Sequence, residues 1–439
     1  MERTVIGDLQ KKISEKVLIQ GWVSVRRDQG KMVFFDFRDR SGSVQGVVLP
    51  KSEAIEAAKD IRAEFVVSVE GTVNKRPDKN VHEGVQNGDI ELEIHKIDIL
   101  SKAEVPFELG SEVNLDTYLD HLPYTLRRES TKNIFKIQAT IAEAFREAMR
   151  EEEFVEFQSP TLVGGDAEGG AAAFKVDYYY EQKAFLATSP QLYKQMMAGV
   201  FERTFAVAKI FRGEKHATTR HLSEAVCMDF EMAFIKDHHD VMHMLEHTMK
   251  HVIAKVIEKH ADALQKMGVQ APLVPEKFPV LKLREAQEIL GVEKAPDLEP
   301  EQERALWEWA KREHNSDFVF VTHFPIEKRP FYTFEDKEDK GYTKYFDLLF
   351  RGLEINSGGQ RVHEYEEVVE RIKQKGLDPA KFTFYLETFK TGMAPHGGCS
   401  TGLERFTARL LDLSNVKEAT LFPRDLNRID TLLSTDKKE

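Results

Sequence analysis

Arginine, histidine and threonine side chains gather in FRGEKHATTRHLSEAVCMDFEMAF, residues 211–234, between two apolar runs that are typical of buried strands. A solvated hairpin needs none of these groups, and the segment lacks the Asn-Gly or Asp-Gly pair of a tight turn. Arg212 and Glu214, two residues apart, leave the first strand on the same face. Guanidinium groups bind phosphate and carboxylate oxygens in pairs. The composition therefore favours a loop that grips a polyphosphate over an exposed charged hairpin, with Arg220 and His221 placed to clamp a β- or γ-phosphate.

A second polar group lies in TSPQLYKQMM, residues 188–197. The Ser-Pro pair is typical of a helix start, because proline is favoured at the first helical position. Gln191 and Lys194 are then three residues apart and share one face of the helix. Lys194 is either a surface lysine that extends its charge into water or a fixed cation aimed at an anionic substrate group. The segment alone leaves both interpretations open.

Oxygen ligands are concentrated in YFDLLFRGLEINSGGQRVHEY, residues 345–365. Asp347, Glu354 and Ser357 supply two carboxylates and a hydroxyl, which are the hard donors that Mg²⁺ prefers. Arg361 follows the Gly-Gly pair as a second candidate anion-binding group. An exposed acidic face is the alternative, and the apolar residues around Asp347 disfavour it. The segment therefore predicts a magnesium site beside an anion.

The fourth segment is HGGCSTGLERFTARLLDL, residues 396–413, in which a glycine-rich turn leads into an amphipathic helix. Arg405 lies in the first turns of that helix, where backbone N–H groups and the helix dipole favour an anion. The turn matches neither the P-loop nor the Rossmann glycine pattern. A nucleotide bound here is therefore held in another way.

The elements that position these segments follow from the hydrophobic pattern. Residues 1–105 contain short apolar or alternating runs separated by turn residues, with one helical piece, SEAIEAAKDIRAEF, after the third run. Five strands with a helix after the third is the order of an OB barrel, whose open face binds oligonucleotides; another small antiparallel barrel is the alternative. Residues 106–128 lack periodicity and are expected to form a hinge. A long amphipathic helix then begins, and Pro160 ends the strand that follows it.

Composition limits the class of protein. The chain has 439 residues, enough for two or three domains, and a formal net charge of −12. No apolar stretch approaches the roughly 20 residues that cross a bilayer, and the N-terminus lacks a signal pattern. The chain's two cysteines, Cys227 and Cys399, are too few for a disulfide framework. We therefore expect a cytoplasmic protein without a membrane partner.

Taken in chain order, these segments resemble the three signature motifs of class II aminoacyl-tRNA synthetases. The long helix with FVEFQSPTL resembles motif 1, residues 211–234 resemble motif 2, and GLERFTARLLDL resembles motif 3. GWVSVRR and FDFRDRSGSVQ resemble the OB-fold anticodon domain of the same class. The resemblance covers essentially the whole chain. It implies an α+β protein with an OB barrel at 1–105, a hinge at 106–128 and a catalytic domain at 129–439 built on an antiparallel sheet flanked by helices.

Within the class, the chain is most similar to the aspartyl and asparaginyl group. Aspartyl enzymes carry lysine at the position of Lys194, and a substrate carboxylate needs cations where a carboxamide needs a donor and an acceptor. The resemblance therefore implies an aspartate–tRNA ligase, with an asparaginyl-tRNA synthetase as the alternative. About 115 residues separate motif 2 from Phe350, so the chain is similar to the compact archaeal and eukaryotic type. Members of that type charge tRNA(Asp) alone or tRNA(Asn) as well, and the sequence leaves this choice open.

The resemblance also implies which residues bind each substrate. Those expected at aspartate are Glu168, Gln191, Lys194, Arg212, Asp229, Ser357 and Arg361. Those expected at ATP are Arg212, Glu214, Arg220, His221, Leu222, Glu354, Gly402, Leu403, Glu404 and Arg405. Arg212 and Arg405 are expected to be catalytic, Arg405 either stacked on adenine or at the γ-phosphate. Mg²⁺ is expected at Asp347, Glu354 and Ser357.

The same resemblance implies the macromolecular partners. Anticodon bases are expected to stack on Phe34 and to meet Gln45 and Glu91, with Arg26 and Arg27 at phosphates. Phe34 is otherwise a barrel core residue, because alternation places one of Phe34 and Phe35 inside. Motif 1 forms the dimer contact in the class, so a homodimer is expected. One departure from the family is Ala225, where many relatives carry an aromatic that stacks on adenine.

Overall fold

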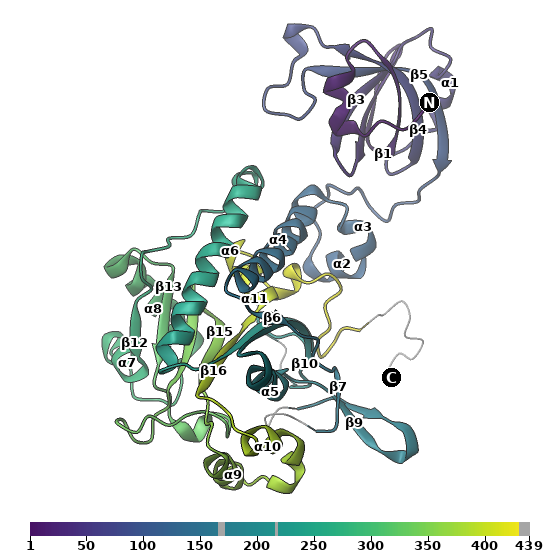
Figure 1. The fold of residues 1–439 in the computed structure, drawn as a ribbon. Helices are drawn as coiled ribbons and strands as arrows, with labels where there is room; N and C mark the ends of the chain where they lie inside the picture. The colour runs from purple at the N-terminus through teal and green to yellow at the C-terminus, as the bar shows by residue number, and fades with distance from the viewer. Residues whose placement is uncertain (166–171, 216–217, 430–439) are drawn as a thin grey trace. The chain divides into compact units, whose positions relative to one another are not determined.

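The computed structural model describes residues 1–165, 172–215 and 218–429 and divides into two compact units, Met1–Glu112 and Val113–Glu439 (Figure 1). The segment 106–128, expected to be an irregular hinge, contains two short helices, α2 (Leu115–Asp120) and α3 (Leu122–Thr125). The Asn114 side chain caps α2 by accepting the Thr117 backbone N–H at 2.8 Å. From Val113 onward this segment therefore forms part of the second unit.

The first unit is a closed barrel with the strand order β1-β2-β3-β5-β4. Its elements are η1 (Ile6–Lys12), β1 (Lys16–Gln29), β2 (Met32–Asp39), β3 (Gly42–Val48), α1 (Ile55–Asp60), β4 (Val66–Lys75), η2 (Asp78–Asn80) and β5 (Ile90–Ser101). Alternation along β2 turns Phe35 and Phe37 into the barrel core and leaves Phe34 half-buried on the outside. The predicted barrel, with its helix after the third strand, is confirmed.

The second unit is built on a sheet with the order β12-β13-β14-β15-β16-β11-β10-β6. Its strands are β6 (Val155–Glu156), β10 (Arg203–Phe211), β11 (Glu224–Ala233), β12 (Val280–Lys282), β13 (Phe318–Thr322), β14 (Tyr345–Phe350), β15 (Leu353–Gln360) and β16 (His396–Gly402). The six strands from β13 to β10 pair antiparallel, as predicted, whereas β12 and β6 pair parallel at the two edges. A small separate sheet contains β7 (Leu162–Val163), β9 (Lys183–Leu186) and β8 (Lys175–Asp177).

Helices of the second unit lie against both faces of this sheet (Figure 1). They are α4 (Glu129–Glu151), α5 (Gln191–Phe201), α6 (His238–Lys266), α7 (Leu283–Leu290), α8 (Pro300–His314), α9 (Tyr365–Gln374), α10 (Thr383–Lys390) and α11 (Leu403–Leu410). Short 3₁₀ turns are η3 (Tyr179–Glu181), η4 (Ile326–Lys328), η5 (Pro379–Phe382) and η6 (Val416–Ala419). None of the helices in the described ranges is long and apolar enough to cross a bilayer.

Successive side chains of β11 point to opposite sides of the sheet, so the strand contributes to the hydrophobic core on one side and to the candidate site on the other. Met228 and Phe230 join the main hydrophobic core, which also contains the apolar faces of α4, α6 and α11. Cys227, Asp229 and Glu231 alternate with them and therefore face the opposite side of the sheet. That side is covered by α5, which places its own polar residues over the same strands. The sheet thus presents charged groups on one face without interrupting the core on the other.

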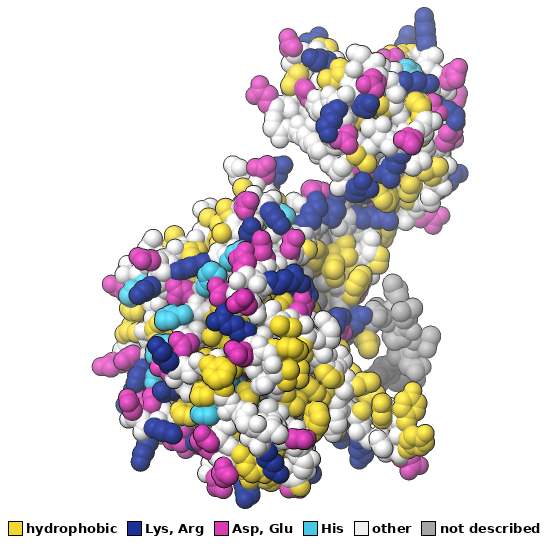
Figure 2. All heavy atoms as spheres, in the orientation of Figure 1, with side chains coloured by type: hydrophobic (Ala, Val, Ile, Leu, Met, Phe, Trp, Pro, Cys, Tyr) yellow, Lys and Arg dark blue, Asp and Glu magenta, His cyan; other side chains and the backbone are white. Residues whose placement is uncertain are grey.

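The surface distribution of charged side chains and the state of the two cysteines can both be compared with what the composition predicts. On the face of the second unit drawn in Figure 2, acidic and basic side chains are interspersed rather than grouped by sign. Cys227 and Cys399 are both buried and free. Burial raises the pKa of each thiol to about 12, so both are neutral at physiological pH. The cysteines form no disulfide, as predicted.

Candidate active site

A pocket in the second unit opens on the sheet face opposite α4 and α6. It collects residues from β10, the loop before β11, β15 and the start of α11. Ten of the residues expected at ATP, metal or amino acid line it: Arg212, Glu214, Arg220, His221, Leu222, Glu354, Ser357, Gly402, Glu404 and Arg405. Segments separated by up to about 190 residues in the sequence therefore meet in one place, and three of the four chemistry-bearing segments line the same pocket.

Lys194 is a buried cation fixed from three sides. Its side chain is 1% exposed, and its ammonium donates hydrogen bonds to Asp229 Oδ2 at 3.0 Å and to the Cys399 backbone oxygen at 2.9 Å. Asp229 is held in turn, since Ser400 Oγ donates to its Oδ1 at 2.7 Å. A snorkelling surface lysine would be solvated. The buried environment therefore excludes a solvated surface lysine and shows that the Lys194 ammonium is fixed in place.

Arg361 is the second buried cation, and Glu231 joins it to the first. Arg361 Nε donates to Glu231 Oε1 at 3.0 Å, while Lys194 Nζ lies 3.5 Å from Glu231 Oε2. Arg361 Nη2 also donates to the Gly398 backbone oxygen at 2.8 Å. The predicted pair of cations is thus brought together through a carboxylate that the sequence analysis did not single out. Glu231 could have been found from alternation, since it lies two residues after Asp229 on the same strand face.

The two cations favour the charged form of the Glu231 carboxylate. Burial raises the pKa of Glu231, but Arg361 and Lys194 outweigh burial and hold that pKa below its usual range. Two cations therefore face two anions in a region closed to water. Beside them, Gln191 Nε2 is buried without a hydrogen-bond partner within the ranges the structure describes. An unpaired buried donor next to two cations suits an incoming carboxylate oxygen.

The metal candidates converge as the sequence predicts. Ser357 Oγ lies 2.6 Å from Asp347 Oδ1 and 3.0 Å from Glu354 Oε1. Burial, with the charge of Glu354, raises the pKa of Asp347 to about 8, although Arg329 opposes the rise. Two carboxylates that share one hydroxyl concentrate negative charge, which Arg329 offsets only in part. The donor set of three hard oxygens fits a divalent cation of the magnesium kind.

Arg329, which the sequence analysis missed, stands behind this acidic pair. Its guanidinium lies 3.9 Å from the centre of the Phe324 ring and 4.6 Å from that of Tyr345. Its Nη2 is 3.5 Å from Asp347 Oδ2. The two rings fix the guanidinium so that its charge is directed at Asp347. No local sequence pattern predicts a role for Arg329, because it lies in a loop and its contacts are with Phe324, Tyr345 and Asp347.

The motif 2 loop is held by the rest of the unit as well as by its strands. Arg220 Nη1 lies 3.2 Å from both carboxylate oxygens of Glu303 on α8. His221 Nδ1 is 2.6 Å from Thr218 Oγ1. Arg405 Nη1 donates to the Glu354 backbone oxygen at 3.4 Å, across the pocket mouth. These bonds direct the cationic groups of the loop toward the pocket that Arg212 and Glu214 also line.

Glu404 lines the pocket and also links α11 to β11 through hydrogen bonds. Both of its carboxylate oxygens accept the Val226 backbone N–H, at 3.0 and 3.1 Å, so the start of α11 is joined to β11. Its neighbour Leu403, also expected at ATP, packs into the main hydrophobic core instead. Neighbouring residues of a helix point about 100° apart around its axis, so Leu403 and Glu404 face different surroundings at the start of α11.

We expect the stability of the protein to depend on pH through Glu404. Burial raises its folded-state pKa to about 7 from an ordinary value of 4.5. Because the folded state then binds a proton that the unfolded state releases, the free energy of unfolding falls as pH rises from about 4.5 to about 7. Relative to Glu404→Gln, this fall amounts to at most about 1.4 kcal/mol per pH unit. Urea unfolding of both proteins at pH 5 and pH 8 measures it, and equal pH slopes would contradict it.

The remaining expected residues are placed as follows. Glu168 lies outside the described residues. On the first unit, Phe34 is paired across β1 and β2 with Arg27, whose Nη2 donates to Gln45 Oε1 at 3.3 Å. Arg26 is turned away from that bond, since its Nε donates to the Ala58 backbone oxygen at 3.2 Å. Glu91 is half-buried on β5, opposite Asn74 on β4.

Comparison with known proteins assigns the family. Residues 114–426 match the family model described as tRNA synthetases class II (D, K and N). The chain belongs to this family. Residues 17–100 of the same synthetase match an OB-fold nucleic acid binding domain. As class II synthetases are ligases that use ATP, an amino acid and tRNA, and generally a divalent metal, the pocket contains the types of group that the family requires.

Individual relatives of this class II synthetase agree over nearly the full chain. The aspartate–tRNA(Asp/Asn) ligase of Thermus thermophilus is 41% identical, covering 97% of this chain and 99% of that protein. The aspartate–tRNA(Asp) ligase of Thermococcus kodakarensis is 40% identical, with 94% and 96% covered. Among solved structures, a putative aspartyl-tRNA synthetase from Leishmania major superposes with a TM-score of 0.89 at 30% identity, covering 97% and 94%. Asparaginyl-tRNA synthetase from Pyrococcus horikoshii also gives 0.89, at 29% identity, covering 98% and 99%.

Proposed function

We propose that this class II synthetase is an aspartate–tRNA ligase that activates L-aspartate with ATP and transfers it to tRNA(Asp). The observation that carries the proposal is the buried pair of cations, Lys194 and Arg361, held by Glu231 within reach of the nucleotide pocket. A carboxylate side chain accepts hydrogen bonds from both cations through both of its oxygens, whereas a carboxamide would turn an N–H donor toward one of them. The relatives named as aspartate ligases support the same choice.

In this proposal Lys194 and Arg361 bind the side-chain carboxylate of aspartate. Gln191 and Ser357 contact the remainder of the amino acid, and Asp229 keeps Lys194 in position. Glu168, outside the described residues, remains the proposed contact of the α-amino group, as the family resemblance implies.

Arg212 bridges the α-carboxylate and the α-phosphate of ATP in the proposed complex, and Glu214 meets the adenine-side donors and acceptors. Arg220, His221 and Leu222 follow the triphosphate, with Arg405 at its far side. A ring at position 225 is absent, so the adenine is covered by the remaining pocket wall, including Gly402 and Glu404. Asp347, Glu354 and Ser357 would hold Mg²⁺, which supplies positive charge to phosphate oxygens when bound.

The proposed reaction has two steps. An oxygen of the aspartate α-carboxylate attacks the α-phosphorus of ATP in line, and the bond to the bridging oxygen breaks, releasing pyrophosphate and leaving aspartyl-adenylate. The terminal ribose hydroxyl of tRNA then attacks the activated carbonyl carbon, loses its proton, and AMP leaves. Positioning and charge neutralisation by Arg212 and Arg405 lower both barriers without a dedicated protein base.

The barrel is proposed to bind the anticodon, with bases stacked on Phe34 and read at their edges by Gln45 and Glu91. Arg26 and Arg27 are the proposed phosphate contacts; Arg26 Nε donates to the Ala58 backbone oxygen at 3.2 Å, and Arg27 donates to both carboxylate oxygens of Asp36 at 2.8 and 2.9 Å. Motif 1 is proposed to form a homodimer contact through β6, an edge strand on which Val155 is exposed. Light scattering at micromolar concentration would test this, and a monomer would exclude it.

A charging experiment with two tRNAs and two amino acids tests the proposal. Purified tRNA(Asp) and tRNA(Asn) are each offered aspartate and asparagine, and the aminoacyl-tRNA formed is measured. We expect aspartate on tRNA(Asp) and no asparagine on either tRNA. Formation of asparaginyl-tRNA would favour an asparaginyl-tRNA synthetase, which is the enzyme in one of the superposed structures. Aspartate on tRNA(Asn) as well would extend the function to both tRNAs, as in the Thermus thermophilus relative.

A further inference from the structure

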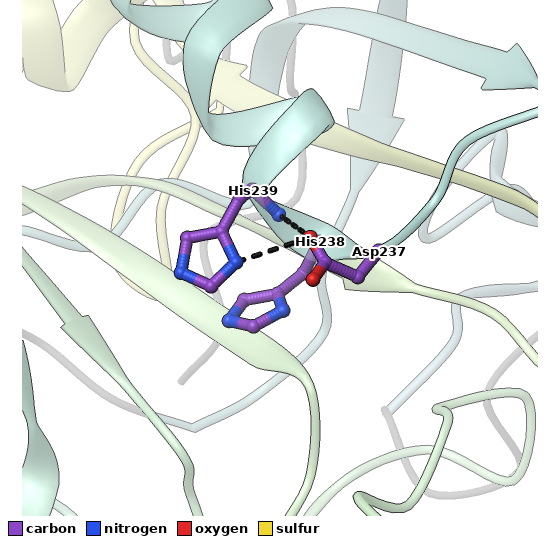
Figure 3. Close-up of side chains that lie close together, drawn as sticks. All are labelled: Asp237, His238 and His239. Atoms are coloured by element: carbon purple, nitrogen blue, oxygen red, sulfur yellow. Dashed lines mark hydrogen bonds and ion pairs between the residues drawn. The ribbon is translucent and has the colours of Figure 1, made fainter.

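Three consecutive residues at the start of α6 carry metal-ligand atoms that lie close together. Asp237, His238 and His239 each offer one ligand atom, and these atoms lie within 4.8 Å of one another. Figure 3 shows the carboxylate and the two imidazoles gathered on the connection between β11 and α6. None of the three lines the nucleotide pocket. The cluster is therefore separate from the proposed active site.

Helix capping accounts for only part of this arrangement. Asp237 Oδ1 accepts the His239 backbone N–H at 2.8 Å, as an aspartate at the N-cap usually does, and it lies 3.0 Å from His239 Nδ1. Both interactions use the same oxygen; within the described ranges no side-chain hydrogen bond involves Oδ2. A capping aspartate needs neither histidine, so the cap leaves the two rings unexplained.

His238 has a more specific requirement. It is 2% exposed, and neither of its ring nitrogens has a hydrogen-bond partner in the described part of the chain. Its ring lies 4.2 Å from that of His239 and 5.5 Å from that of His323, centre to centre. His323 is already engaged, with Thr322 Oγ1 at 2.9 Å and Asp336 Oδ2 at 3.1 Å. A buried imidazole without partners is costly, and such groups call for a bound ion or water.

The chemistry of the three donors points to a particular class of ligand. Imidazole nitrogens are common metal ligands, and both ring nitrogens of His238 are buried without a partner in the described part of the chain. Two imidazoles and one carboxylate suit Zn²⁺, whereas Mg²⁺ prefers oxygen donors alone. The dipole of α6 and the nearby Lys344 disfavour a cation, and the negative charge of Asp237 offsets them.

We propose that Asp237, His238 and His239 bind one Zn²⁺ ion, with water completing its coordination. The ion supplies His238 with the partner it lacks and links it to Asp237 and His239 at the first turn of α6. Its role is structural, and it is independent of the divalent ion proposed at Asp347.

Calorimetric titration of the metal-free full-length protein with Zn²⁺ tests the proposal. Excess Mg²⁺ occupies the all-oxygen site during the titration, since hard donors accept it there. We expect one bound Zn²⁺ per chain, with an affinity lowered about 100-fold or more in His239→Ala and His238→Ala, because each removes a ligand. The His239 side chain is 51% exposed, so we expect His239→Ala to fold normally even if His238→Ala unfolds.

Two further variants separate metal binding from capping and from other clusters. Asparagine caps a helix as well as aspartate does, so Asp237→Asn is expected to fold normally and still bind Zn²⁺ about 10-fold more weakly. His251→Ala changes the other His-carboxylate cluster, with Glu147 and Glu151, and is expected to bind Zn²⁺ like the wild type. The absorption of bound Co²⁺, used as a spectroscopic substitute, should show a four-coordinate ion that His239→Ala abolishes. Equal Zn²⁺ affinity in wild type and His239→Ala, or no saturable binding by the wild type, would overturn the proposal.

Discussion

Replacing Arg212 with alanine is expected to slow aspartyl-adenylate formation by about 100-fold or more, equal to about 3 kcal/mol. Arg212 lines the pocket at the end of β10, on the same face as Glu214. In the proposed complex its guanidinium contacts both the attacking carboxylate and the α-phosphate, where negative charge accumulates in the transition state. A fixed cation at that position needs no rearrangement during the reaction, so its loss affects the barrier directly. ATP–pyrophosphate exchange measures the rate.

A second cation on β10 provides the control for this prediction. Lys209 precedes Arg212 by three residues, has a side chain that is 62% exposed, and pairs with Glu224 at the surface. Lys209→Ala removes a positive charge from the same strand and is expected to leave exchange within about twofold, as a solvent-exposed pair contributes little. If both variants reduced exchange equally, or if Arg212→Ala exchanged normally, the proposed role of Arg212 would be wrong.

Much of the site could be predicted because local periodicity carries it. Alternation along β10, β11 and β15 and the glycine turn before α11 place Arg212, Asp229, Ser357 and Arg405 on one side of the sheet, and each of these follows from spacing of two or from a helix start. The barrel followed in the same way from short alternating runs. These features need only a few neighbouring residues to be recognised.

The residues that were missed depend on contacts between distant segments. Arg361 reaches Glu231 across 130 positions of sequence, and Arg220 reaches Glu303 across 83. Arg329 is oriented by the Phe324 ring and by Tyr345 and Asp347, which both lie on β14. Alternation places Glu231 on the site face of β11, but no local pattern shows which distant residue such a charged group pairs with, because most charged residues are solvated. In the amino acid site, the sequence was enough to predict the two cations, whereas the buried anion that joins them was recognised only from the structure.

Replacing Arg361 with glutamine is expected to have the other large effect, on both stability and aspartate use. The change leaves Glu231, which is fully buried, with only Lys194 at 3.5 Å. Removing one partner of a buried ion pair costs about 3–5 kcal/mol, so the free energy of unfolding should fall by that amount. Aspartate also loses a cation, so kcat/KM for aspartate in exchange should fall at least about 100-fold. Urea unfolding and exchange kinetics measure the two effects separately.

The double variant Arg361→Gln with Glu231→Gln distinguishes a structural arginine from one that binds substrate. Replacing both charges removes the unpaired buried anion, so most of the lost stability should return. The aspartate carboxylate still lacks its cation, so kcat/KM should stay low. Arg371→Gln, which breaks the partly exposed pair with Glu335, is the control and should change stability by about 1 kcal/mol or less and leave exchange unchanged. If the double variant regained aspartate activation together with stability, Arg361 would act only by neutralising Glu231, and Lys194 alone would have to select the carboxylate.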